Sequence, residues 1–167
     1  MWYLSPIDRL LHLFSNPRDS KLMRWWASDE RKKDDGVLHH PFDAQHWKDF
    51  DAKYLEFHED MRNIRFDLST DGMNPFGDRT STHSTWPIIL SIYNLPPWLC
   101  QKRKYLLLTI IISGPKALGI TVDVFLEPLM QEMETLWKHG VKMWDELAKS
   151  TFTCKAIIFV TITDYPG

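Results

Sequence analysis

The sequence is poor in cysteine and carries no excess of charge. Its two cysteines, Cys100 and Cys154, lie far apart and form no CxxC pair, which argues against a disulfide framework and against a cysteine zinc site. We expect both thiols in the core of a protein from a reducing compartment. With 20 basic and 22 acidic residues the formal charge is −2, so the whole chain lacks the attraction that a strongly basic protein has for nucleic acid.

Long hydrophobic runs are also missing. The longest aliphatic run, Leu106 to Ile112, is far shorter than the ~20 apolar residues of a membrane helix. The first residues lack a basic leader followed by an unbroken apolar stretch, so they do not resemble a secretory signal. We therefore expect a soluble, intracellular protein. A chain of 167 residues, 44% apolar and 25% charged, is long enough for one globular core.

Residues 1–60 are crowded with charge, tryptophan and histidine, and we expect short helices and loops there. Leu10, Leu11 and Phe14 would share one helical face. Asp19 would cap a second helix, and the Asp-Asp-Gly sequence at 34–36 is typical of a turn. Three apolar residues of the second helix would point inward: Leu22, Met23 and Trp26.

From Asn63 the pattern changes to strands. Apolar residues alternate with polar ones from Ile64 to Leu68, and this run ends at Asp71. A second apolar run covers 86–94 and a third covers 104–113, and the short links between the three runs predict an antiparallel meander. Because the third run is apolar on both faces, we expect it to be central, with other structure covering both faces of the sheet.

The rest of the chain predicts one long helix and further strands. Apolar residues recur at helical spacing from Val122 to Trp137, and Gly140 would end this helix. Residues 141–145 would add a short strand, and the apolar run from 154 to 163 would be a buried strand that ends at Asp164. The predicted class is α/β, with a mixed sheet of about four strands and a crossing helix.

This order places one acid after the first strand and another after the fourth. Two divalent cations about 3.5–4 Å apart can bridge a phosphodiester, and they need hard oxygen ligands on rigid elements. If the two strands are neighbours, Asp71 and Asp164 meet at one end of the sheet. The alternative is ordinary turn chemistry, because Asp-Gly and Asp-x-Pro are both common in loops.

Several long strings resemble one known family. In chain order they are RWWASDERKKDDGVLHHP, RNIRFDLSTDGMNPFG, STHSTWPIILSIYNLPPWLCQKRKYLLL, SGPKALG and VDVFLEPLMQEM. They are similar to the transposases of plant CACTA (En/Spm-type) elements, and the resemblance runs over essentially the whole chain. It implies a truncated RNase H-like catalytic domain over residues 61–167, preceded by a helical and loop-rich segment over residues 1–60.

The resemblance also implies a chemistry. Transposases of the DDE type use three acids that bind Mg²⁺ or Mn²⁺, nick DNA at the ends of the element, and join the freed 3′-hydroxyl to target DNA in the nucleus. By motif, Asp71 and Asp164 are the first two catalytic, metal-binding acids. The third would lie beyond Gly167, so we expect a fragment that is inactive or nearly so. Its partners would be DNA, at transposon ends and target, and either a second copy of itself or full-length transposase, with no membrane.

Three departures from the family motifs are expected of a decayed copy. Asp67 stands where the motif has glycine, Leu118 where proline is common, and Ile120-Thr121 replaces a more polar pair. Asp67 lies in the same predicted strand as Asp71, and the alternation points both side chains to one face. We expect a solvated or ion-paired acid at position 67, with a stray metal ligand as the alternative.

Other polar and aromatic groups have a structural and a functional interpretation, and we favour the structural one for each. The HHxxDxxH cluster matches no metal-helix spacing. His83 would bond the loop backbone rather than approach a phosphate, and the KRK turn would be solvated rather than bound to DNA. Tryptophans would be core residues rather than base-stacking groups. The residues concerned are His39, His40, Asp43, His46, His83, Lys102, Arg103, Lys104, Trp86 and Trp137.

Two further hypotheses stay open. The chain could persist as a non-catalytic protein- or DNA-binding module that pairs through an incomplete sheet. It could also be an unrelated two-metal nuclease.

Overall fold

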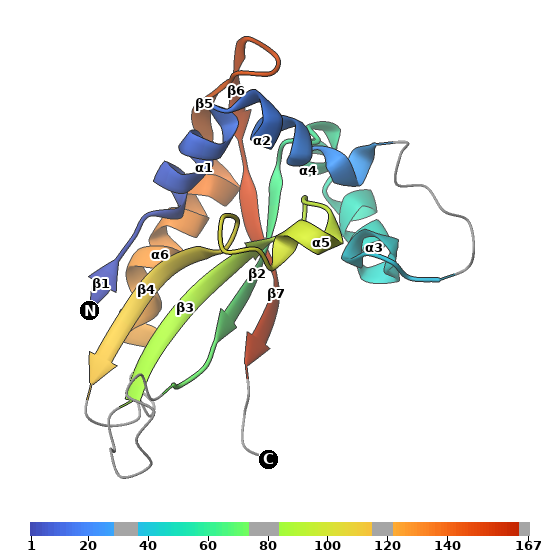
Figure 1. Cartoon of the computed structure of the whole chain (residues 1–167). Coiled ribbons are helices and arrows are strands. Elements are labelled where there is room, and N and C mark those ends of the chain that lie inside the picture. The colour runs from blue at the N-terminus through green and yellow to red at the C-terminus, as the bar shows by residue number, and fades with distance from the viewer. Residues whose placement is uncertain (29–36, 74–83, 115–121, 164–167) are drawn as a thin grey trace.

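The computed structural model describes residues 1–28, 37–73, 84–114 and 122–163 (Figure 1). The main sheet has five strands, which lie in the order β1 (Trp2–Tyr3), β4 (Leu107–Gly114), β3 (Ser84–Ile92), β2 (Ile64–Thr70) and β7 (Ala156–Thr163). A separate hairpin consists of β5 (Val141–Asp145) and β6 (Ser150–Cys154). The helices are α1 (Pro6–Phe14), α2 (Pro17–Leu22), α3 (Gln45–Lys53), α4 (Leu55–Glu59), α5 (Pro97–Cys100) and α6 (Val122–Lys138), with short 3-10 turns η1 (Trp25–Ala27) and η3 (Pro41–Asp43).

The sheet is mixed. The pairs β2–β3 and β3–β4 are antiparallel, which confirms the predicted meander. The chain then passes through α6 and the hairpin before β7 returns parallel to β2. The α/β class is confirmed.

The predicted central position of the third strand is wrong. This strand, β4, lies next to the two-residue strand β1, so it is close to one edge of the sheet. One face of β4 is buried through Ile110 and Ile112, whereas Leu108, which a register shift in the β3–β4 pairing turns to the other face, is 37% exposed. α1 and α6 lie behind the sheet, and over its lower half the front face has no helix in the part of the chain that is described (Figure 1). A strand that is apolar on both faces therefore need not be covered on both.

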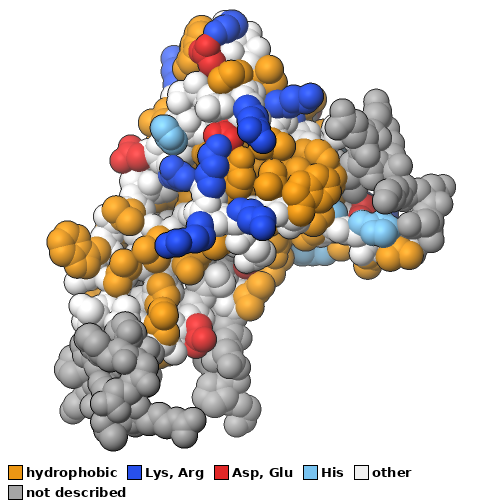
Figure 2. Space-filling view, viewed as in Figure 1, with side chains coloured by type: hydrophobic (Ala, Val, Ile, Leu, Met, Phe, Trp, Pro, Cys, Tyr) orange, Lys and Arg blue, Asp and Glu red, His pale blue; other side chains and the backbone are white. Residues whose placement is uncertain are grey.

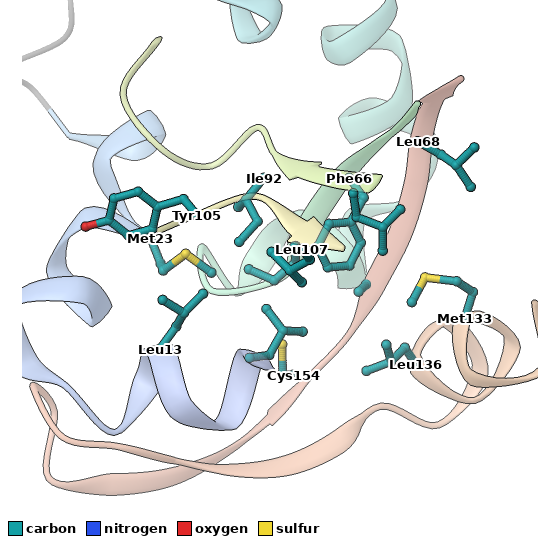
Figure 3. Packing of buried hydrophobic residues seen from close by; sticks show 14 of the residues in the cluster. Leu13, Met23, Phe66, Leu68, Ile92, Tyr105, Leu107, Met133, Leu136 and Cys154 are labelled. Carbon is teal, nitrogen blue, oxygen red and sulfur yellow. The ribbon is translucent and has the colours of Figure 1, made fainter. Parts of the chain in front are cut away.

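The hydrophobic core fills the space between the sheet and the helices behind it. Figure 3 shows Leu13 of α1 and Met23, which follows α2, on one side of this core, Phe66 and Ile92 of the sheet in it, and Leu136 of α6 on its other side. Completely burying a side chain of this size stabilises the fold by about 1.5–3 kcal/mol. The N-terminal helices thus share one core with the sheet, while the proposed boundary between segments 1–60 and 61–167 stays a prediction.

The first two helices form where they are expected, with two changes. In α1, Leu10 and Phe14 are buried, but Leu11 is 38% exposed and Leu13 takes the inward position. In α2 the cap is Asn16, whose side chain accepts from the backbone N–H groups of the first turn. Asp19 is 3% exposed inside α2 and does not cap it. The inward apolar residues of this region are as predicted: Leu22, Met23 and Trp26.

The long helix and its end are confirmed. α6 buries Leu129, Met133 and Leu136, and Gly140 follows with a φ of 68°. A Cβ at this position would come within 2.6 Å of Thr153 Cγ2, so glycine is required both by conformation and by space. The run 154–163 is not one strand, because β6 ends at Cys154 and β7 begins at Ala156.

No helix among the described residues is long and apolar enough to cross a membrane.

Candidate metal site at the ends of two parallel strands

Strands β2 and β7 lie side by side and run in the same direction. Their register pairs Ser69 with Ile162 and Thr70 with Thr163. Asp71 is the next residue after β2, and it is exposed to solvent. Asp164 is the next residue after Thr163 in the sequence, and it lies outside the described residues. The predicted adjacency of the two strands is therefore observed, up to the residue before each acid.

The backbone after Asp71 is held against the neighbouring strand. Met73 forms a β-bridge with Thr85, with two backbone hydrogen bonds of 2.9 and 2.8 Å. Gly72 lies between Asp71 and Met73, and a Cβ at this position would come within 2.7 Å of Trp86 Cζ2. The Asp-Gly pair is thus more than a free turn, because the glycine lets the Trp86 ring approach the backbone directly after the acid.

Asp67 is neither solvated nor ion-paired. It is 2% exposed, and among the described residues its Oδ1 has no hydrogen-bond partner and no ion pair to it is found. Burial raises the pKa of this carboxyl above its ordinary value. The expectation of a solvated or paired acid is wrong, because Asp67 lies on a strand that is paired on both sides, with Ser91 of β3 and Val160 of β7, and its side chain is buried.

Asp67 and Asp71 also stand too far apart to share a cation. Four residues of strand span about 13 Å at ~3.3 Å per residue, whereas carboxylate oxygens bind Mg²⁺ at about 2.1 Å. Asp67 therefore does not act as a stray ligand of an ion held by Asp71.

Replacing Asp67 with Asn should stabilise the protein by about 1 kcal/mol at pH 7, because the buried carboxylate has no compensating partner among the residues that the structure describes. The raised pKa means that the folded state binds this proton more tightly than the unfolded state. The stability that protonation contributes is complete below the unfolded pKa and is lost as the pH rises through the folded pKa. Urea unfolding from pH 3 to pH 8 should show the two proteins diverging as the pH rises.

The exposed Asp49 provides the matched control. Asp49→Asn should leave the dependence on pH unchanged. A destabilised Asp67→Asn protein at pH 7 would contradict the interpretation.

Two members of the HHxxDxxH cluster, His40 and Asp43, form hydrogen bonds with backbone groups. His40 Nδ1 accepts from the Phe42 backbone N–H at 3.1 Å, and its Nε2 lies 3.2 Å from the Leu95 carbonyl oxygen. Asp43 accepts from the backbone N–H groups of His39 and His40 at 3.0 and 2.9 Å. Within the described ranges no group of three or more His, Cys, Asp or Glu side chains could hold a metal ion.

Most of the other structural interpretations agree with the observed packing. Trp137 packs on Tyr54 and Phe57, with ring centroids 5.2 and 5.6 Å apart. Both thiols are buried, and burial raises the pKa of Cys100 to about 11. Lys104 donates to Asp19 at 2.7 Å and is thus paired rather than merely solvated. His83, Leu118, Ile120, Thr121 and the 34–36 turn lie outside the described residues.

Two buried charge sites were missed from the sequence. Arg65 is completely buried and pairs with Asp51. Asp145 is also completely buried, and it accepts from Ser20 Oγ at 2.7 Å and pairs with Arg24. Arg65 alternates with the apolar residues of its strand, which made it look like a solvent-facing residue. No local pattern distinguishes it from one, because the helices that cover it come from elsewhere in the chain.

The geometry defines an α/β protein whose mixed sheet presents an exposed carboxylate at the end of a strand that has a parallel neighbour. A family model described as "Transposase family tnp2" matches residues 35–167. The chain belongs to this transposase family. A search of curated proteins found no match, and a search of solved structures found none.

Proposed function

We propose that this chain carries part of the catalytic domain of a DDE-type DNA transposase, in which Asp71 and Asp164 bind Mg²⁺ or Mn²⁺. The observation that carries the proposal is the parallel register of β2 and β7, which extends to Thr70 and Thr163, one residue before each acid. The family match supports action on DNA in general. The finer assignment to plant CACTA elements, and with it a nuclear location, rests on the motif strings.

The strand order supports an RNase H-like fold as part of this proposal. Three antiparallel strands are followed by a crossing helix and then by a strand parallel to the first, which gives the spatial order β4-β3-β2-β7. The β5–β6 hairpin would be an addition between the crossing helix and the last strand. Such a sheet places the ends of its parallel strands β2 and β7 at one edge, where catalytic acids would lie together.

The donor chemistry fits a hard divalent cation. Asp71 offers exposed carboxylate oxygens on a backbone held by β2 and by the Met73 bridge, and oxygen ligands on rigid elements are what Mg²⁺ and Mn²⁺ prefer. When bound, such cations activate water and stabilise charge on a phosphodiester. The role of this chain's own residues is to fix the carboxylates at one end of the sheet.

Metal binding tests the proposal. Titration of Mn²⁺ into the purified chain, followed by electron paramagnetic resonance, should give a site that Asp71→Asn weakens at least tenfold, about 1.4 kcal/mol or more. Asp67→Asn is the matched control, because residue 67 lies on the same strand about 13 Å away. Equal Mn²⁺ affinity in wild type and Asp71→Asn would contradict the assignment.

We expect the 167-residue chain on its own to nick DNA poorly. Asp71 and Asp164 alone leave a second cation short of protein ligands. Strong Mn²⁺-dependent nicking that Asp71→Asn abolishes would support the metal site and overturn the expectation of inactivity.

A second candidate is a non-catalytic pairing module. In the described sheet β7 has β2 as its single strand neighbour, and Ile162 on it is 53% exposed. An open strand edge can accept a strand from another chain, which favours pairing with a second copy or with a longer transposase. Light scattering after size-exclusion chromatography tests this, and a monomer at all concentrations would argue against it.

A further inference from the structure

A hollow lined by both tryptophan and basic residues lies between α2, η1 and α5. Its volume is about 930 Å³. Trp25 and Trp98 line it with their ring centroids 5.5 Å apart and an angle of 76° between the ring planes. Trp98 is 64% exposed, although most large apolar side chains of this size are covered. We call this site the Trp98 hollow.

Basic side chains surround the Trp98 hollow. Arg18, Lys21 and Arg24 line it. Arg24 pairs with Asp145, but Arg18 and Lys21 are exposed on α2, and neither has an ion pair in the described part of the chain. Figure 2 shows Lys and Arg side chains gathered around an apolar patch on this face.

The turn after α5 extends this basic surface. Lys102 and Arg103 are exposed, and the turn is fastened to α2 because Lys104 Nζ donates to Asp19 at 2.7 Å. The Asp19 carboxylate is itself buried and is neutralised by Lys104, so it adds no negative charge to the surface. Among the described residues this surface is therefore locally cationic, although the chain as a whole carries a formal charge of −2.

We propose that the Trp98 hollow binds single-stranded DNA, with unpaired bases stacked on Trp98 and phosphates held by the cations around it. This inference rests on the proposed function for its substrate. An exposed aromatic ring within a cationic rim is the arrangement that binds single strands without reading their sequence, since every base has a π face. A paired base cannot stack on a side chain in this way, which favours a single strand over a duplex.

The Trp98 hollow is separate from the proposed metal site, and backbone hydrogen bonds connect its neighbourhood to the strand that ends at Asp71. The backbone N–H of Trp26 donates to the Asn94 carbonyl oxygen at 3.3 Å, and the Asn94 side chain accepts from the Arg65 backbone N–H at 3.0 Å. These bonds tie the hollow to the beginning of β2. Asp71 lies six residues further on, about 20 Å at ~3.3 Å per residue. A DNA strand with about 3.4 Å per nucleotide covers the length of the chain from Arg65 to Asp71 in about six nucleotides.

Fluorescence anisotropy with a labelled oligothymidine tests the proposal on the whole chain. Trp98→Ala should weaken binding about tenfold, because it removes a stacking platform. Lys21→Glu should weaken binding several-fold and lower the slope of log affinity against log salt by about 0.7 for each phosphate that is no longer neutralised. The matched controls are Trp2→Ala, at a tryptophan 74% exposed on β1, and Lys142→Glu, at an exposed lysine of β5.

Three results would overturn the proposal. The first is equal affinity for oligothymidine in the hollow variants and the control variants. The second is tighter binding of duplex DNA that Trp98→Ala does not change, and the third is binding of an acidic peptide with no binding of oligothymidine. Thermal melts establish that each variant is folded. Asp71→Asn should keep its affinity for oligothymidine, so that failure of the metal site and failure of the hollow are distinguished.

Discussion

Replacing Asp51 with Ala should lower the free energy of unfolding by about 3–5 kcal/mol, because it leaves the buried Arg65 guanidinium without its counter-ion. Arg65 is completely buried, and Asp51 is the acid that pairs with it. Two of its nitrogens, Nε and Nη1, have no hydrogen-bond partner among the described residues. Burial lowers the pKa of Arg65 to about 10, so the side chain is still charged at neutral pH.

Aromatic rings supply the rest of the environment of Arg65. Its Cζ lies 4.2 Å from the ring centroid of Trp47 and 5.0 Å from that of Phe57, with Trp26 and Phe50 at 5.1 and 5.4 Å. The ring faces attract the cation, but they do not replace a carboxylate. These four rings and Arg65 pack the N-terminal helical segment onto the sheet. Loss of the Arg65–Asp51 pair should therefore destabilise α3 and α4 first.

Urea unfolding at pH 7 measures the effect. Replacing both members, Arg65→Met with Asp51→Ala, should recover much of the lost stability, because no buried charge is then left unpaired. If Asp51→Ala lowers the free energy of unfolding by less than about 1 kcal/mol, the Arg65 guanidinium must reach water or another partner in the variant, and the prediction is wrong.

Asp145→Ala should lower the free energy of unfolding by about 3 kcal/mol at pH 7, because hydrogen bonds to a charged group contribute about 1.5–3 kcal/mol each. The substitution should also remove part of the pH dependence of stability in the acidic range. This carboxylate accepts from Ser20 Oγ at 2.7 Å and from the backbone N–H groups of Leu147 and Ala148 at 3.1 and 3.2 Å. It also pairs with Arg24 and, at 3.4 Å, with Arg62. The site joins α2 to the β5–β6 hairpin.

The pKa of Asp145 gives the sign of the acid effect. Burial alone would raise this pKa, but the hydrogen bonds from Ser20 and Ala148 and the charge of Arg24 lower it on balance. The native carboxylate thus binds its proton less tightly than the unfolded one. The stability it contributes is complete above the unfolded value of about 3.9 and is lost as the pH falls through the folded value.

Unfolding of Asp145→Ala and wild type from pH 2 to pH 7 checks this prediction. The difference between the two proteins should shrink toward low pH. Glu146→Gln, at the next residue, is the control and should show no comparable loss. A difference that is constant over the whole range would mean that the loss arises from packing rather than from charge.

The sequence by itself determined the elements whose signal is local. The helix α6 with its 3.6-residue period, the strand β2 and the glycine that ends α6 depend on neighbouring residues, and each of these elements is found where it was predicted. The motif strings were equally local, and they identified the transposase family that the match to residues 35–167 shows. The proposal of Asp71 as a metal ligand has the same origin, because this residue lies within such a string.

Tertiary structure decided which residues of those elements are covered, and by what. Asp67 and Arg65 alternate like surface residues of β2, yet both are buried, since aromatic helices distant in sequence pack over Arg65. The parallel pairing of β2 with β7, which carries the proposed metal site, joins segments about 90 residues apart. The cationic rim of the Trp98 hollow likewise arises because Asp19 turns inward to Lys104 and Tyr105. Burial and strand adjacency are properties of distant contacts, and a local pattern carries no information about them.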